Sequence, residues 1–506
     1  MTWGAAQIAS LRRPEAQWVL ETVRISANTL GTPGFRASSH PSVSGGSHQL
    51  AADPSAQGAT LSPRSWSSTW GGFGISVIAE TPLELRQLSE AMPRGAIVRL
   101  RRGTPSLAVS QWPTVAIGAV QNLRGNTYPN FRLNCIDPLA GLVGRVVSSN
   151  LSVSEQPLFS DVSESAETFL TADYTAGAGS ITVDNPSIFA KSAGGPGAVL
   201  ITPASGDPFY VLYSGITGST LTLTGGNVMG TTRVNAVTGR PVKHVAYLAG
   251  HPLTIAKNIL LGTSSDYPST WRLGFPTELV DSDDITRHLT GVGVPATGSL
   301  QWTFPVLEAQ PDPVGWLTSF LAAGGCYLTF RQGKITVRMG QATRPAKLLT
   351  SYTIRDADIS RVDSYESHLQ AAQPEYLLTW ATTATGTSVT PSGTIPAAQS
   401  RPAGAIYAYD VRDRVFTNES AIRDLMLARL AEPQLRIPER LVLQMAGLEA
   451  ARLAPGDVCP TELRRAPTRM PWGAAATPSG TARIDEVSPS WAAGTVRLGL
   501  LQYPAA

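Results

Sequence analysis

Apolar residues along the chain occur mostly in short runs or in alternation with polar residues, the spacing typical of β-strands. In the first 150 residues, strands are predicted at 18–25, 74–78, 97–100, 115–120 and 130–136. A helical spacing occurs at 81–92, where Thr81, Pro82 and Glu84 form the pattern of a capping box with proline in the first turn. Residues 1–150 are therefore predicted to be a β-rich domain with one helix.

Two segments differ from this pattern. Residues 31–63 are rich in serine, glycine, proline and histidine, and we expect a long polar connection there. Residues 165–246 have almost no helical signal and contain four strand-and-turn pairs, at 180–183, 198–201, 209–213 and 220–224. This regular spacing predicts a small β-sandwich or β-barrel, inserted into the surrounding unit.

The remaining chain mixes both patterns. In the predicted central α+β domain, 247–383, a helix at 253–261 follows Pro252, and Asp312 and Pro313 begin a second helix. A hairpin of 326–330 and 334–339 comes next. Residues 384–404 read as a flexible loop. In the predicted C-terminal domain, 405–506, Thr417 or Asn418 caps a helix ending near Leu430, and β structure follows with a tight turn at 453–458. The fold class is thus mainly β with a few short helices, in several domains.

Composition narrows the class of protein. The 506 residues carry 40 Lys and Arg against 37 Asp and Glu, a formal charge of +3, and only 15% are charged, against roughly 25% in an average chain. Without blocks of basic residues, specific nucleic-acid binding is not expected. The first ten residues lack the pattern of a signal peptide, and no run of about 18 apolar residues predicts a membrane span. We expect a soluble protein made in a cytoplasm.

Candidate chemistry is sparse. The sequence has no phosphate-binding loop, dinucleotide-binding glycine motif, nucleophile elbow or zinc-protease motif. The carboxylates of Asp281, Asp283 and Asp284 suit a hard cation, but Asp283 or Asp284 equally suits the cap of a short helix at 285–289. His40 and His48 flank a Ser/Gly loop. The sequence leaves open whether these two histidines bind a metal ion or are solvated side chains. We therefore expect no catalytic, cofactor-binding or metal-binding residue, and no cofactor.

Cysteine and tryptophan also allow structural interpretations. Cys135, Cys326 and Cys459 lie far apart beside apolar residues, which favours buried thiols over a disulfide framework. Exposed aromatic residues bind sugars or partner proteins, and buried ones fill cores. Both possibilities stay open for five tryptophans near predicted element edges: Trp66, Trp70, Trp271, Trp302 and Trp316.

Several segments together resemble structural proteins of tailed bacteriophages. Residues 169–183, with the strands at 197–201, 210–213 and 220–223 and the stretch from Gly230-Thr231 to 239–242, resemble a β-module of such proteins, although Asn235-Ala-Val-Thr stands where that pattern has a histidine. Residues 94–100 and 131–139 are similar to the opening domain of tail-tip or baseplate hub proteins. Further hub-like segments are 312–339, 422–430, 453–458 and 494–501.

The resemblance implies a hub with two tail-tube-like β-barrel domains per subunit. Three subunits would form a ring that joins the tail tube or distal tail protein to a central spike or fibre, in a virion tail tip assembled in the host cytoplasm. It implies a role in host attachment and genome delivery and no enzymatic activity. The low charge suits a ring with large buried surfaces. The alternatives are a receptor-binding tail protein, a hydrolase of cell-wall or capsule glycans acting through Asp281, Asp283 and Asp284, or a carbohydrate-binding protein.

Overall fold

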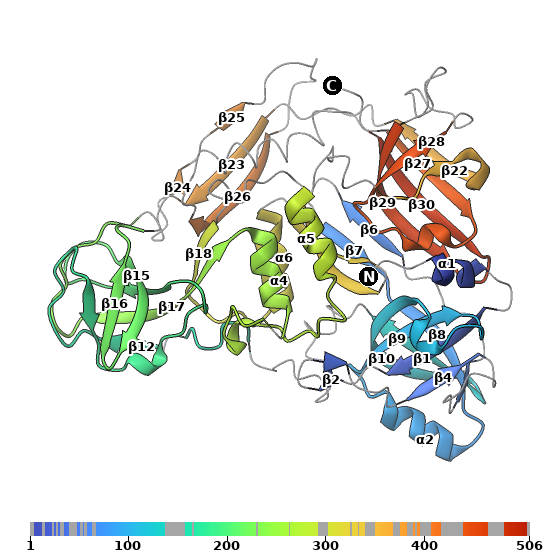
Figure 1. Cartoon of the computed structure of the whole chain (residues 1–506), viewed down its shortest axis with the longest axis horizontal. Helices are drawn as coiled ribbons and strands as arrows, with labels where there is room; N and C mark the ends of the chain where they lie inside the picture. Colours follow the sequence, from blue (N-terminus) through green and yellow to red (C-terminus); the bar gives the residue numbers. More distant parts are fainter. Residues whose placement is uncertain are drawn as a thin grey trace.

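The computed structural model describes most of the chain, and every statement about structure concerns this part. The described residues are 5–12, 16–22, 25–26, 29–30, 35–39, 48–50, 54, 58–62, 67–136, 157–163, 166–228, 231–262, 264–291, 302–323, 326–331, 333–339, 350–367, 375–381, 388–389, 392–394, 406–415, 439–463 and 480–502. They are mainly β-strands with five α-helices, which confirms the predicted fold class (Figure 1). None of these helices is long and apolar enough to span a membrane.

The N-terminal part forms a closed barrel of seven strands. Around the barrel they are β1 (Gln17–Thr22), β4 (Arg36–Ser38), β5 (His48–Leu50), β8 (Phe73–Ile78), β11 (Asn130–Ile136), β10 (Thr114–Thr127) and β9 (Ile97–Gly103). Because side chains alternate along a strand, Trp18 and Leu20 of β1 enter the core while Glu21 points outward. The short helix α1 (Ala5–Arg12) packs against β9, and β2 (Ile25–Ser26) pairs with β3 (Thr29–Leu30).

Helix α2 (Pro82–Ala91) confirms the predicted capping box. The Glu84 amide donates to Thr81 Oγ1 at 3.2 Å, and the Thr81 amide donates to Glu84 Oε2 at 3.3 Å. The expected long connection at 31–63 is wrong, because it contains β4, β5 and β6 (Ala59–Ser62). These strands have three or four residues, too few to show an alternation, and partners elsewhere in the chain define them.

The inserted unit is a barrel-like sheet, which we call the inserted barrel. Its order is β12 (Glu167–Phe169), β17 (Pro241–Gly250), β14 (Gly197–Ile201), β15 (Phe209–Thr217), β16 (Thr220–Thr224) and β13 (Ser180–Thr182). The two end strands meet where Leu170 bridges Val183 and the Thr171 amide donates to the Thr182 carbonyl at 3.0 Å. The strands thus surround an apolar core of their own, set to one side of the molecule (Figure 1).

The central part joins this barrel to the rest. The second half of β17 pairs with β18 (Trp302–Val306), and helices α4 (Pro252–Leu260), α5 (Ser282–Gly291) and α6 (Pro313–Ala323) lie beside the hairpin of β19 (Cys326–Arg331) and β20 (Lys334–Met339). The predicted cap is confirmed, since the Gly315 amide donates to Asp312 Oδ1 at 2.9 Å. The hairpin is confirmed as well.

The C-terminal part is an eight-stranded sheet. Its order is β21 (Ile354–Arg355), β28 (Val458–Glu462), β29 (Gly480–Ser490), β30 (Thr495–Gln502), β27 (Glu439–Ala446) and β22 (Ile359–Ser367), and β6 with β7 (Ser67–Trp70) extends it from β29. Strands of the predicted 1–150 and 247–383 domains thus belong to this sheet, and β17 crosses the predicted limit at 246. The division into domains stays a prediction.

A further sheet contains parts of the predicted loop. It is formed by β23 (Glu375–Ala381), β24 (Ser388–Val389), β25 (Ser392–Thr394) and β26 (Ile406–Val415). The loop expected over 384–404 therefore includes two short strands, which pair with β23. The helix predicted from Thr417 or Asn418 to Leu430 lies outside the described residues.

Candidate functional site: the junction of barrel, hairpin and sheet

The acidic cluster singled out in the sequence lies at the start of α5. Asp281 is the capping residue, since its Oδ1 accepts the Asp284 amide at 3.1 Å. Asp283 is exposed, whereas Asp284 is buried and turned to the protein interior. The three carboxylates do not converge, and the described residues contain no group of three side chains placed to hold a metal ion. Asp281 therefore caps the helix, in the role expected for Asp283 or Asp284.

Asp284 is held by arginines and a threonine. Arg338 Nε donates to its Oδ2 at 2.8 Å and Thr336 Oγ1 donates to the same oxygen at 3.0 Å. Arg287 and Arg331 contact Oδ1 at 2.5 and 3.3 Å. Burial by itself raises the pKa of a carboxyl, but these positive charges, Arg338 first, outweigh it and hold the pKa of Asp284 well below its usual value. Asp284 is thus a permanent anion at neutral pH.

Arg338 connects the hairpin to the C-terminal sheet. It is fully buried, and besides Asp284 it contacts Asp457 Oδ1 through Nη2 at 3.0 Å, a contact of charges without hydrogen-bond alignment. Its Nη1 donates to the Pro455 carbonyl at 3.1 Å, and Tyr327 donates to the same carbonyl at 3.4 Å. Burial lowers the pKa of a guanidinium, but Asp284 and Asp457 more than compensate, so the pKa of Arg338 is raised. The turn at 453–458 is therefore bonded to α5 through β20.

The barrel and the C-terminal sheet share one continuous core. The rings of Trp18 in the barrel and Trp491 after β29 meet edge to face, with centroids 5.4 Å apart. Arg102 lies over the Trp18 ring at 4.8 Å and donates to the Trp491 carbonyl at 3.3 Å. The two β units are consequently packed together although they are distant in sequence, and they lie next to each other in space (Figure 1).

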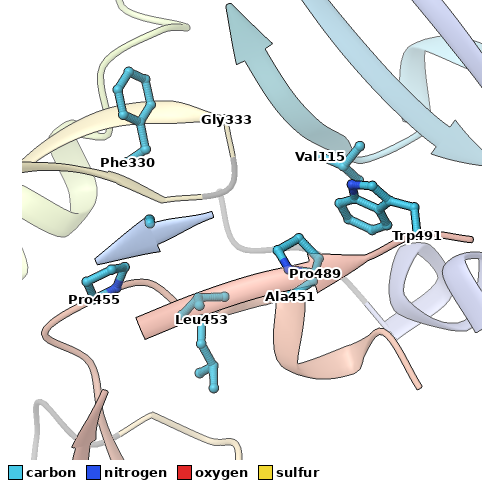
Figure 2. Close-up of a pocket in the computed structure, with 10 residues that line it drawn as sticks. Val115, Phe330, Gly333, Ala451, Leu453, Pro455, Pro489 and Trp491 are labelled. Atoms are coloured by element: carbon cyan, nitrogen blue, oxygen red, sulfur yellow. The ribbon is translucent and has the colours of Figure 1, made fainter. Parts of the chain in front are cut away.

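A small cavity lies where barrel, hairpin and sheet meet. It has a volume of about 60 Å³, and Val115, Phe330, Gly333, Pro489 and Trp491 are among its lining residues (Figure 2). Ligand pockets are roughly 300–1,000 Å³, so this cavity has room for a few water molecules and no substrate. Within the described part, the buried Nε1 of Trp491 has no hydrogen-bond partner, which suits a bound water.

A second buried cluster connects the inserted barrel to the central part. Asp161, on the segment before β12, accepts hydrogen bonds from Trp271 Nε1 at 3.0 and 2.9 Å, and its Oδ2 is 3.2 Å from His244 Nε2. His244 belongs to β17 and is fully buried. Burial raises the pKa of Asp161, but the bonds from His244 and Trp271 lower it more, so its pKa lies below the ordinary value. This cluster positions the inserted barrel.

The other residues singled out in the sequence are structural or lie outside the described part. Cys135, Cys326 and Cys459 are buried and form no disulfide with a described residue, and burial raises the pKa of Cys135 and Cys459. Trp271 is buried, and Trp316 is partly buried against Phe320 with ring centroids 5.3 Å apart. His48 pairs within the barrel through its backbone. His40, Trp66 and the side chains of Trp70 and Trp302 are not described.

Sequence reasoning missed Arg338 and Asp457. A signal was present in β20, where Ile335, Val337 and Met339 alternate with Thr336 and Arg338 and both faces are buried. A charged residue in a strand buried on both faces requires a charged partner.

Comparisons with known proteins give distant likenesses only. No protein-family model matches the chain, and no curated protein matches it. The 43 kDa tail protein of prophage MuSo2 from Shewanella oneidensis is 10% identical, with 96% of each chain covered and a TM-score of 0.36. The prophage tail protein gp18 from Listeria monocytogenes EGD-e is 6% identical, with 96% of this chain and 94% of that chain covered and a TM-score of 0.39.

A third similar structure is that of the phage P2 baseplate in its activated conformation with Ca, 8% identical, with 96% of this chain and 98% of that chain covered and a TM-score of 0.25. These three structures are of prophage tail proteins and a phage baseplate. At such TM-scores the likeness carries no argument about this chain.

Proposed function

We propose that this chain is a structural protein of a bacteriophage tail, and within the tail a hub of the tip or baseplate. Its ring, a trimer, joins the tail tube or distal tail protein to a central spike or fibre. The observation that carries the proposal is the pair of β units, a closed barrel and an eight-stranded sheet, packed on one core within a single chain. A subunit that supplies two neighbouring elements of a tube needs this arrangement, and the hub-like segments of the sequence point the same way.

The chemistry of the described residues supports a role in assembly. The candidate acids do not face a cleft: Asp281 caps a helix and Asp284 is bonded to three arginines. The cavity at the junction holds water at most. Paired acids for glycan hydrolysis need an open site between them for the sugar. We therefore propose a protein without catalytic activity, whose function is the geometry of its contacts.

Immunogold electron microscopy of tailed particles that contain this chain tests the proposal. We expect gold at the distal tip of the tail, with an antibody against a major capsid protein as a matched control that labels heads. Label along the whole tail shaft would point to a tube protein instead. Label absent from particles, with the chain free in the lysate, would overturn the tail assignment. An assay on cell-wall and capsule glycans would then decide the enzymatic alternative.

A further inference from the structure

Two arginines lie opposite each other on the outer surface of the N-terminal barrel. Arg124 on β10 is paired with Arg132 on β11 in the strand register. In the adjoining pair, Leu133 lies in the core and Leu123 packs against it, so the two arginines, one position further along, point outward. Arg124 is exposed and Arg132 is half-buried. Like charges directly opposite each other on two strands repel, so this pair is unfavourable in the barrel by itself.

No carboxylate of the described part neutralises this pair. The described residues of 17–136 include eight arginines and four glutamates. Three of these glutamates are engaged elsewhere: Glu21 with three arginines, Glu84 in the cap of α2, and Glu90 with an arginine of the same helix. Neither Arg124 nor Arg132 forms an ion pair with a described residue. Two neighbouring guanidinium groups are therefore left with charge that can bind an anion.

The surrounding strands hold Arg132 in place. Its Nε donates to Asn134 Oδ1 at 3.3 Å, and Asn134 Nδ2 donates to Asn122 Oδ1 at 2.8 Å. The guanidinium lies across Gly74 on β8, where an added Cβ would be 2.5 Å from its Nη2. Glycine inside a strand weakens the strand and often marks the close approach of another group, and no positive φ requires glycine at Gly74. The glycine thus makes room for the Arg132 guanidinium, whose Nη groups bond to no described residue.

The charge of this surface favours a carboxylate as the ligand. The Cβ atoms of two directly opposite residues are about 5 Å apart, so two arginines can hold one oxyanion between them through their N–H donors. A nucleic-acid backbone is bound by a series of basic residues. Other arginines of the barrel do not form such a series, because Arg99 and Arg101 are bonded to Glu21 and Arg102 lies over the ring of Trp18. Two arginines match a single carboxylate better than a polyanion.

We infer that Arg124 and Arg132 bind the carboxylate of an acidic side chain on a partner protein. The barrel is closed and has no free strand edge, so a partner on this face has to be bound through outward side chains. Asn134 and Gly74 are positioning residues, because they orient Arg132 and do not touch the carboxylate. The site is complete within one chain and does not depend on the proposed place in the tail.

Titration of the full-length protein with a peptide of six glutamates tests the site. In protein labelled with ¹⁵N-arginine, NMR spectra follow the Nε–H signal of each arginine. We expect the signals of Arg124 and Arg132 to shift, while that of Arg94, an exposed arginine in the turn after α2, does not. Arg124→Gln and Arg132→Gln are each expected to weaken peptide binding about threefold or more. Arg94→Gln removes the same charge from an isolated position and is the matched control.

Two further measurements separate a binding site from general attraction to a positive surface. Gly74→Ala keeps both charges but displaces the Arg132 guanidinium, and we expect weaker peptide binding in this variant. An oligonucleotide of six thymidines carries a similar negative charge, and we expect it to bind less tightly than the peptide.

Thermal unfolding of the free protein gives a readout that a structural role of these arginines would move in the opposite direction. Removing one of two opposed charges relieves their repulsion, so Arg124→Gln should raise the melting temperature by about 1 °C. An arginine that only stabilised the barrel would lower the melting temperature when replaced. The peptide should raise the melting temperature of the wild type more than that of Arg124→Gln, because a ligand stabilises the state that binds it.

Each outcome decides the inference. Shifts at Arg124 and Arg132, with weaker binding in both variants and unchanged binding in Arg94→Gln, support it. Equal weakening in Arg94→Gln overturns it, as does tighter binding of the oligonucleotide or the absence of shifts at millimolar peptide. Circular dichroism checks the fold of each variant, and Arg124→Gln alters only an exposed side chain, so it decides the matter even where Gly74→Ala does not fold. The labelling of tail particles is judged separately.

Discussion

Replacing Arg338 by methionine removes the only side chain that touches both Asp284 and Asp457 among the described residues. Methionine has a similar length and no charge, so the change deletes the contacts at 2.8 and 3.0 Å without opening a large cavity. Two carboxylates then remain buried with fewer positive neighbours. Breaking a buried ion pair by removing one partner costs about 3–5 kcal/mol. We expect a loss of this size for the part of the protein that contains β20, α5 and the turn at 453–458.

The assay must report on this part because a chain of several units need not unfold in one step. Hydrogen exchange with mass spectrometry on the full-length protein measures the opening free energy of β20 and of the turn at 453–458 separately. Tryptophan fluorescence during urea unfolding gives a second readout, since Trp18 and Trp491 lie in the neighbouring core. Arg86→Met is the matched control, and we expect no measurable change there, because the Arg86 pair with Glu90 is exposed to solvent. A loss below about 1 kcal/mol in Arg338→Met would refute the reasoning.

Five other substitutions have expected outcomes. Gly333→Ala should lower the free energy of unfolding by about 2 kcal/mol, because its φ is +74° and an added Cβ would lie 2.6 Å from a side chain of β10. Gly239→Ala should cost about 1 kcal/mol, because its φ is +80° but the space around it is open. Thermal unfolding of the two variants compares these costs. Thr81→Ala removes the capping box of α2 and should cost about 1 kcal/mol, read from hydrogen exchange in α2. Asp161→Asn should speed hydrogen exchange in β17, because it removes the charged acceptor that Trp271 and His244 contact. Unchanged exchange would show that the Asp161 cluster does not hold the inserted barrel in place. The pKa of Asp284 is lowered in the folded protein, so its contribution to stability is complete above its ordinary pKa of 3.8 and is lost as the pH falls further. The difference in melting temperature between wild type and Asp284→Asn should therefore shrink in acid.

Elements with complete local signals could be predicted from the sequence. Helix α2 was predictable because Thr81, Pro82 and Glu84 determine its start within four residues. The hairpin of β19 and β20 was predictable because Gly333 adopts a positive φ between two alternating strands. In each case the residues that decide the structure are neighbours in the chain, so pattern reasoning has the information it needs.

The junction could not be predicted, because its partners are distant in sequence. Nothing near Arg338 indicates that Asp457 lies opposite, and nothing near β6 indicates that it pairs with β29. Asp284 was noticed as part of an acidic run, but its role depends on three arginines supplied by α5, β19 and β20. Such contacts follow from how the sheets are stacked, and a single sequence contains no direct record of that.

Strand β17 belongs to two bodies at once. Its first half pairs with β14 inside the inserted barrel, and its second half pairs with β18 in the central part. A hydrogen-bonded strand cannot act as a swivel between the sheets that it joins, so the inserted barrel follows any rotation of the central part as a stiff arm (Figure 1). It follows too that the inserted barrel cannot be grafted onto another protein by cutting at its edge. Transfer of the inserted barrel to another protein has to include all of residues 241–250, together with a strand that pairs with their second half in the register of β18.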